Sequence, residues 1–212
     1  MSGRWTRIER GVTQAFPNAL SDEDVCWYAR EYVKSGGYSA SDGNQLIANF
    51  KMSPNSANYA SRQFYKDRAC SHFAKEVANA LLDNVSLCVI PTSKKPDSPE
   101  FDPRWMMFIR ELRRIRSDLI IESPFEIIES HQCAHHGGDR GTNVFYNKLR
   151  WLGLTQMSDS IVVIDDVITS GNHFVDCKRM LLENSTVRSV YGLFWALAID
   201  PPDDDQLELL EF

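Results

Sequence analysis

The sequence predicts an α/β protein: a mostly parallel β-sheet flanked by helices, with a helical region at its N-terminus. Three observations lead to this prediction. Short apolar runs rich in β-branched residues alternate with helical patterns after residue 84, most plainly at Ile161–Ile164 and Val187–Ile199. Such alternation is typical of parallel strands joined by right-handed crossovers. The 212 residues suffice for one domain of this kind with a small addition.

Residues 1–83 form the predicted helical N-terminal region, which would act as a hood over the core or as a partner surface. Ser21, followed by three acids, is typical of a helix N-cap, and apolar residues at helical spacing continue to Tyr32. Two further helices are predicted over residues 43–50 and 58–82.

Residues 84–212 form the predicted α/β core with an acidic C-terminal tail. The sequence predicts its strands over residues 85–90, 119–121, 125–128, 161–164 and 187–199. The helices are expected over residues 103–116, 142–152 and 171–182, and a glycine-rich loop over 131–141.

Charge and composition restrict the function. A formal charge of −6 weighs against a protein that binds the nucleic-acid backbone in bulk. The first twenty residues contain no apolar segment typical of a secretory signal, and the longest uncharged apolar stretch, Ser189–Ile199, is too short to span a bilayer. Five cysteines at irregular spacings suggest reduced thiols, so we expect a cytoplasmic protein without a membrane partner.

The strand predicted at Ile161–Ile164 is followed by two adjacent carboxylates, Asp165 and Asp166, and then by small polar residues that lead into a helix. A loop of this kind can surround a phosphate with backbone N–H groups at the helix N-terminus. Neighbouring carboxylates would repel a bare phosphate, but they can accept hydrogen bonds from sugar hydroxyls or lie near a magnesium ion. A sugar phosphate satisfies both parts of the motif.

The stretch from Ile161 to Phe174 resembles the phosphoribosyl pyrophosphate motif of type I phosphoribosyltransferases. The resemblance implies that Asp165 and Asp166 hold the ribose hydroxyls, with Mg²⁺ bound nearby through the substrate. The other substrate-binding residues that it implies are Val167, Ile168, Thr169, Ser170, Gly171, Asn172 and His173, of which Thr169 to His173 would surround the 5-phosphate. His173 departs from the family, which usually has Thr or Ser at this position.

A second resemblance concerns Gln132, Arg140 and Asn143, whose spacing is similar to that of the ComF-like branch of the family. It implies a loop that closes over the diphosphate, with Arg140 as its catalytic cation. His135 stands where ComF proteins usually have Leu. The three histidines and one cysteine between residues 131 and 136 could instead suggest zinc, but their adjacency favours a polar loop over a structural zinc site.

The loop after the first core strand is the third part of the predicted site. Thr92 and Ser93 would bind the diphosphate, Lys94 would stabilise its charge as a second catalytic cation, and Arg104 would add to this site from the start of the next helix.

The leading hypothesis is a magnesium-dependent phosphoribosyltransferase, a glycosyltransferase of nucleotide metabolism that joins phosphoribose to a nitrogen acceptor. Thr169 stands where purine-salvage members carry an acid, which weighs against a plain hypoxanthine–guanine enzyme. A second hypothesis is a non-catalytic phosphoribosyl pyrophosphate sensor or regulatory protein, with a protein partner or a second copy bound through the N-terminal helices. A third is hydrolysis or transfer on a sugar-phosphate nucleotide held in the same loop.

Overall fold

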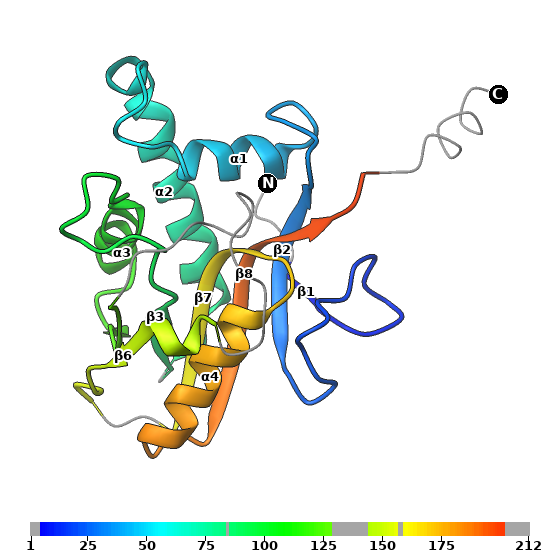
Figure 1. Cartoon of the computed structure of the whole chain (residues 1–212), viewed down its shortest axis with the longest axis vertical. Coiled ribbons are helices and arrows are strands. Elements are labelled where there is room, and N and C mark those ends of the chain that lie inside the picture. The colour runs from blue at the N-terminus through cyan, green and yellow to red at the C-terminus, as the bar shows by residue number, and fades with distance from the viewer. Residues whose placement is uncertain (1–4, 84, 129–143, 157–158, 202–212) are drawn as a thin grey trace.

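A computed structural model describes residues 5–83, 85–128, 144–156 and 159–201 of the chain. Six strands form the main sheet in the order β1-β2-β8-β7-β3-β4, and every pairing is parallel except that of β1 with β2 (Figure 1). These strands are β1 (Thr6–Arg7), β2 (Cys26–Val33), β3 (Ser86–Val89), β4 (Ile120–Glu122), β7 (Ser160–Ile168) and β8 (Ser189–Ile199). The predicted fold class, a mostly parallel sheet flanked by helices, is confirmed.

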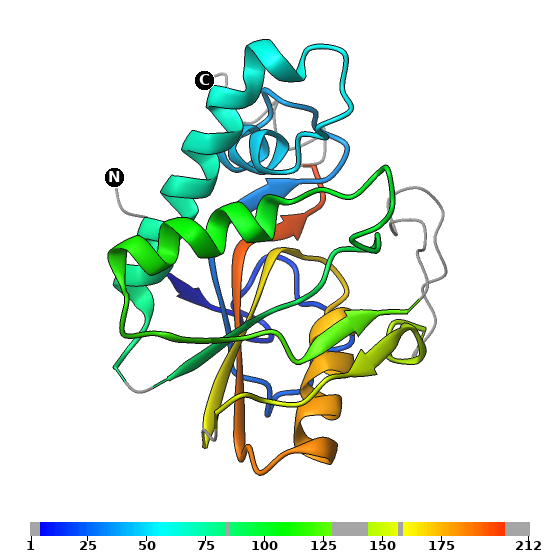
Figure 2. The same ribbon diagram turned by 90° about the vertical axis from the view of Figure 1, so that its left-hand side faces the viewer.

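Helices cover both faces of this sheet. They are α1 (Asp42–Phe50), α2 (Tyr59–Ala80), α3 (Arg104–Ile115) and α4 (Asn172–Asn184). Figure 2 shows α3 (green) and α4 (orange) on opposite sides of the sheet. The four predicted helices that correspond to these elements are confirmed.

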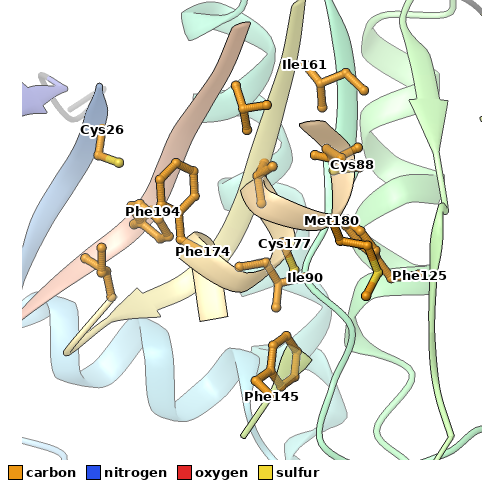
Figure 3. Close-up of a cluster of buried hydrophobic side chains, with 14 of the residues drawn as sticks. Cys26, Cys88, Ile90, Phe125, Phe145, Ile161, Phe174, Cys177, Met180 and Phe194 are labelled. Atoms are coloured by element: carbon orange, nitrogen blue, oxygen red, sulfur yellow. The ribbon is translucent and has the colours of Figure 1, made fainter. Parts of the chain in front are cut away.

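The two faces of the sheet bury separate apolar clusters. Phe73, Phe108 and Trp195 belong to the cluster under α2 and α3. Phe174 and Cys177 of α4 belong to the cluster on the other face, which Figure 3 shows. Because successive side chains of a strand point to opposite faces, the residues of β7 from Ile161 to Ile164 contribute alternately to both clusters.

A small two-stranded antiparallel sheet, β5 (Phe125–Ile127) with β6 (Leu149–Trp151), follows β4. A short 3₁₀ turn at Tyr146–Lys148 precedes β6. The helix predicted over residues 142–152 is therefore wrong in its described part, from residue 144 on. Leu149 and Trp151 alternate with Arg150 and pair with Ile127 and Phe125, so the period of two outweighs the helical pattern.

The helix predicted from Ser21 to Tyr32 is also wrong, because residues 26–33 form β2 and pair with β8 along the main sheet. Aromatic and β-branched residues suit a strand, and pairing with β8 outweighs the local helix signal. The carboxylate of Asp24 accepts hydrogen bonds from both the backbone N–H and the hydroxyl of Ser21, and it forms an ion pair with Lys178. The N-terminal region is thus helical only in α1 and α2, and the division of the chain at residue 83 stays a prediction.

The start of α1 packs directly on β2. A Cβ atom on Gly43 would lie 2.0 Å from the carbonyl oxygen of Glu31, so this close approach requires glycine. The side chain of Asn44 accepts a hydrogen bond from the N–H of Val33 at 2.9 Å and donates one to its carbonyl oxygen at 2.9 Å. These contacts fix α1, and therefore Lys51 just after it, beside the sheet.

Within the described residues, no helix combines the length and apolar character needed to cross a lipid bilayer.

Candidate functional site

The acidic pair lies on β7 rather than after it. The predicted strand ends at Ile164, but β7 continues to Ile168 and stays paired with β8 over its whole length. Pairing with β3 ends earlier, where the N–H of Ile90 donates to the carbonyl oxygen of Ile164. The acids therefore occupy a segment of β7 that extends past its neighbour β3.

Asp165 and Asp166 belong to opposite faces of the sheet. Asp166 lies two and four residues after Ile164 and Val162, so it is on the same face of β7 as these residues, which pack in the cluster under α2 and α3. Asp165 is on the same face as Ile161, which packs in the cluster beneath α4. The two carboxylates therefore meet different surroundings.

Asp166 is buried and ion-paired with two cations. Lys51 Nζ lies 2.7 Å from its Oδ1, and Arg104 Nη2 lies 3.1 Å from its Oδ2. Burial raises the pKa of Asp166, but Lys51 and Arg104 outweigh this effect and hold the pKa below its usual value. Both carboxylate oxygens thus already face a positive charge.

The charge network continues from Arg104 to Asp102 and Lys66. Arg104 Nη1 lies 2.9 Å from Asp102 Oδ2, and Lys66 Nζ lies 2.8 Å from Asp102 Oδ1. The ammonium group of Lys66 is fully buried and also donates to the carbonyl oxygens of Phe50 and Met52, at 2.7 and 2.8 Å. Acids and bases alternate along this chain, so each buried charge has an opposite neighbour.

Three cations of this network were either assigned another partner or not predicted from the sequence. Arg104 was predicted for the diphosphate, but its guanidinium pairs with Asp166 and Asp102. Lys51 and Lys66 carried no signal, because single lysines on or beside helices are usually solvated. Only the three-dimensional fold brings Lys51 to Asp166 and Lys66 to Asp102.

Asp165 is half-buried, and its Oδ1 accepts a hydrogen bond from the N–H of Asp166 at 2.8 Å. Burial and the neighbouring Asp166 carboxylate raise the pKa of Asp165 to about 7. Asp165 can therefore change its charge near neutral pH, whereas Asp166 stays ionised.

The loop from Thr169 to Gly171 connects β7 to α4. Gly171 precedes the helix with φ of +87°, a left-handed conformation that favours glycine. The N–H of Asn172 donates to the hydroxyl of Ser170 at 3.5 Å. The loop thus turns tightly into the N-terminus of α4, where backbone N–H groups and the helix dipole favour an anion.

A segment of the N-terminal region packs against this loop. The N–H of Ala19 donates to the carbonyl oxygen of Ser170 at 2.9 Å. A Cβ atom on Gly171 would meet the side chain of Leu20 at 3.1 Å. Nothing in the sequence indicated this support, because it depends on chain segments about 150 residues apart.

His173 lies in the first turn of α4, with its ring stacked on that of Phe145. The ring centroids are 4.0 Å apart and the planes meet at 25°. The imidazole is thus held by an aromatic side chain at the entrance to α4.

The loop after β3 and the loop after β7 both begin at the carboxyl ends of their strands and lie on the same side of the sheet, because the two strands are parallel neighbours. In this loop Thr92 donates its hydroxyl to the carbonyl oxygen of Lys94 at 3.2 Å, and Ser93 lies between them. Lys94 Nζ lies 2.5 Å from a carboxylate oxygen of Glu100. Lys94 is thus paired to an acid of the same segment, and the binding of a diphosphate by this loop stays a prediction.

The remaining predicted residues, Gln132, Arg140 and Asn143, lie outside the described part of the chain, as does the cluster of histidines at 131–136.

Among the described residues, no group of three or more His, Cys, Asp and Glu side chains is placed to hold a metal ion. Both oxygens of Asp166 face cations, which leaves Asp165 as the one carboxylate of the pair for a Mg²⁺ ion. Binding of Mg²⁺ stays a prediction.

No family model and no curated protein matches the chain. Among solved structures, it is similar to hypoxanthine phosphoribosyltransferase from Staphylococcus aureus in an orthorhombic and a tetragonal crystal form, with 11% sequence identity and a TM-score of 0.36 in both. The matches cover 65% and 63% of this chain and 74% and 72% of those chains. Membership of a family, and of its ComF-like branch, stays a prediction.

Proposed function

We propose that the chain binds phosphoribosyl pyrophosphate at the end of β7, with Mg²⁺ carried by the phosphates of the ligand. The observation that supports this most is the geometry around Gly171. A left-handed glycine turns an acid-bearing central strand directly into the N-terminus of α4. That arrangement suits a sugar phosphate, because N–H groups meet the phosphate while a carboxylate remains within reach of hydroxyls.

In this proposal the loop from Thr169 to His173 binds the 5-phosphate and Asp165 accepts hydrogen bonds from the ribose hydroxyls. Asp166 has a different task from the one that the family resemblance implies. Its ion pairs with Lys51 and Arg104 make it a positioning residue that holds two cations at the edge of the sheet. Lys94 would reach the diphosphate after leaving Glu100, assisted by Arg140.

The proposed reaction is transfer of phosphoribose to a nitrogen acceptor. The bond between C1 of the ribose and the diphosphate oxygen breaks, and diphosphate leaves with the electron pair. A nitrogen lone pair forms the new bond to C1, and that nitrogen releases its proton to water. The protein would contribute position and charge stabilisation, with cations beside the leaving diphosphate.

A second candidate function is binding of the same ligand without transfer, as a sensor. The pairing of Lys94 with Glu100 and the closed network around Asp166 favour it, because these charges are already compensated within the protein. A sensor needs the loop for the 5-phosphate but no free cation for a leaving group.

Titration calorimetry with phosphoribosyl pyrophosphate and MgCl₂ tests the proposal. The variant Thr169→Val/Ser170→Ala removes the hydroxyls of the loop and should weaken binding about tenfold or more, since each lost hydrogen bond to a charged group costs about 1.5–3 kcal/mol. The control Thr6→Val/Ser39→Ala removes two exposed hydroxyls elsewhere and should leave the affinity unchanged.

Product analysis with a panel of nitrogen bases then separates the two functions. Release of diphosphate with formation of a ribosylated base supports the transferase. Binding without any product supports the sensor. Absence of binding in the wild-type protein contradicts both.

A further inference from the structure

A groove lies between α1 and α2, with β2 at its base, on a part of the molecule that the proposed phosphoribosyl site does not use. It has a volume of about 710 Å³. Figures 1 and 2 show α1 beside α2, whose C-terminal part runs along a face of the sheet. Their facing residues recur at helical spacing, for example Asp42 and Asn49 on α1 and Arg68 and Lys75 on α2. The volume is typical of a site for one small molecule.

The groove is positively charged on an acidic protein. Arg30, Arg68 and Lys75 line it against a single lining carboxylate, Asp42, and Glu76 lies beneath Arg30. Three cations less two carboxylates leave a charge of +1, on a chain whose formal charge is −6. Arg68 and Lys75 are exposed, and no described carboxylate forms an ion pair with either. Two cations two turns apart on one helix face can bind a phosphate.

Buried polar atoms in the groove lack partners. Asn49 is 8% exposed; its Nδ2 donates to the hydroxyl of Tyr38 at 3.3 Å, but its Oδ1 has no hydrogen-bond partner among the described residues. The Nε of Arg30 is likewise buried and unpartnered in the described part of the chain, although its Nη2 pairs with Glu76. A buried polar atom without a partner is destabilising, so both positions favour a ligand that supplies an N–H donor and an acceptor.

Planar side chains add a third feature. The rings of Tyr38 and Tyr65 line the groove while 44% and 47% exposed, and His72 lies between Tyr65 and Lys75 on the same face of α2. Exposed rings beside cations are suited to stacking against a planar ligand.

We propose that this groove binds a nucleoside phosphate. The phosphate would lie between Arg68 and Lys75, the base would stack on a tyrosine ring, and an N–H of the base would donate to Asn49 Oδ1. The site is independent of the phosphoribosyl pyrophosphate site and would exist whether or not the chain binds that ligand.

Calorimetry and ¹⁵N NMR with AMP, GMP, CMP and UMP test this proposal on the full chain. At least one of them should bind with Kd below about 1 mM and shift the side-chain amide signals of Asn49. Arg68→Ala/Lys75→Ala should weaken binding about tenfold or more, as loss of charge-assisted hydrogen bonds predicts. Because both side chains are exposed, this variant should fold like the wild type.

Two control variants and two control ligands complete the experiment. Arg113→Ala/Arg114→Ala removes two exposed cations from α3 and should keep the wild-type affinity. Mononucleotides also carry the 5-phosphate and ribose that the proposed phosphoribosyl site would bind, so Asp165→Asn serves to separate the two sites. Nucleotides should still shift the side-chain amide signals of Asn49 in this variant. The free nucleoside and inorganic phosphate should each bind about tenfold more weakly than the nucleotide, because each offers half of the contacts.

Several results would overturn the proposal. These are absence of binding of all four nucleotides at about 5 mM, equal affinity in Arg68→Ala/Lys75→Ala, and inorganic phosphate competing as well as the nucleotide. A single-stranded oligonucleotide that binds far more tightly than any mononucleotide would also overturn it, in favour of a nucleic-acid surface.

Discussion

Two adjacent carboxylates, Asp165 and Asp166, have different surroundings on the two faces of β7. On the face toward α2 and α3, Asp166 is 2% exposed and forms ion pairs with Lys51 and Arg104. On the face toward α4, Asp165 is half-buried and carries a pKa raised to about 7. Two adjacent acids of a motif can therefore have different roles, because successive side chains of a strand point to opposite faces of the sheet.

The largest effect should distinguish the two acids by stability. Asp166→Asn leaves Arg104 and Lys51 without their shared anion, so it should lower the free energy of unfolding by about 3–5 kcal/mol. Asp165→Asn should not destabilise the protein at pH 7, because it removes a carboxylate that burial disfavours. Urea unfolding of both variants measures this, and equal losses would contradict the comparison.

The dependence of stability on pH should also differ between the two acids. The pKa of Asp165 in the folded protein lies above its usual value of 3.8, so the folded state binds more protons than the unfolded state between about pH 4 and 7. Its contribution therefore falls as pH rises through this range. The pKa of Asp166 is lowered, so its contribution is present above about pH 4 and is lost as pH falls further.

Urea unfolding between pH 4 and 8 tests this difference. The stability of Asp165→Asn relative to wild type should increase steadily from pH 4 to 7 and level off above. A constant difference over the range would mean that Asp165 has an ordinary pKa in the folded protein.

A smaller effect is expected at the start of α4. His173→Thr restores the residue type usual in phosphoribosyltransferases but removes the stacking on Phe145, so it should cost about 1 kcal/mol of stability. If the imidazolium pairs with the 5-phosphate, the ratio of wild-type to His173→Thr affinity for phosphoribosyl pyrophosphate should fall from pH 5.5 to 8.5, since the change in charge of Asp165 affects both proteins alike. Calorimetry across this range decides it; tighter binding by the variant at every pH would mean that the histidine obstructs the loop.

The smallest effect concerns the pair of Lys94 and Glu100. Because Glu100 is exposed, Glu100→Gln should leave the free energy of unfolding nearly unchanged. It should nevertheless strengthen binding of phosphoribosyl pyrophosphate a few-fold by releasing Lys94. Glu126→Gln, which breaks the exposed pair with Arg150, is the matched control and should leave the affinity unchanged. Unchanged binding in Glu100→Gln would remove Lys94 from the proposed site.

Sequence patterns predicted the central strands, four helices and the loop at Gly171, because buried apolar runs and glycine punctuation are local signals. They misassigned β2, because the acids that precede it at residues 22–24 resemble a helix start, while its strand character depends on pairing with β8. They also missed Lys51 and Lys66, since a charge becomes part of a network only when distant segments meet. The two acids lie on opposite faces because β7 extends to Ile168. The sequence did not predict this extension, because the polar residues of the motif resemble a loop.

The most direct test of the account is the affinity of Asp165→Asn for phosphoribosyl pyrophosphate with Mg²⁺, measured by calorimetry at pH 8, where Asp165 is ionised. The control is Asp118→Asn, which removes an exposed carboxylate just before the amino end of β4. Loss of charge-assisted hydrogen bonds to the ribose should weaken binding by Asp165→Asn about tenfold or more while the control stays at the wild-type value. Equal affinity of wild type and a folded Asp165→Asn variant would contradict the proposed phosphoribosyl site.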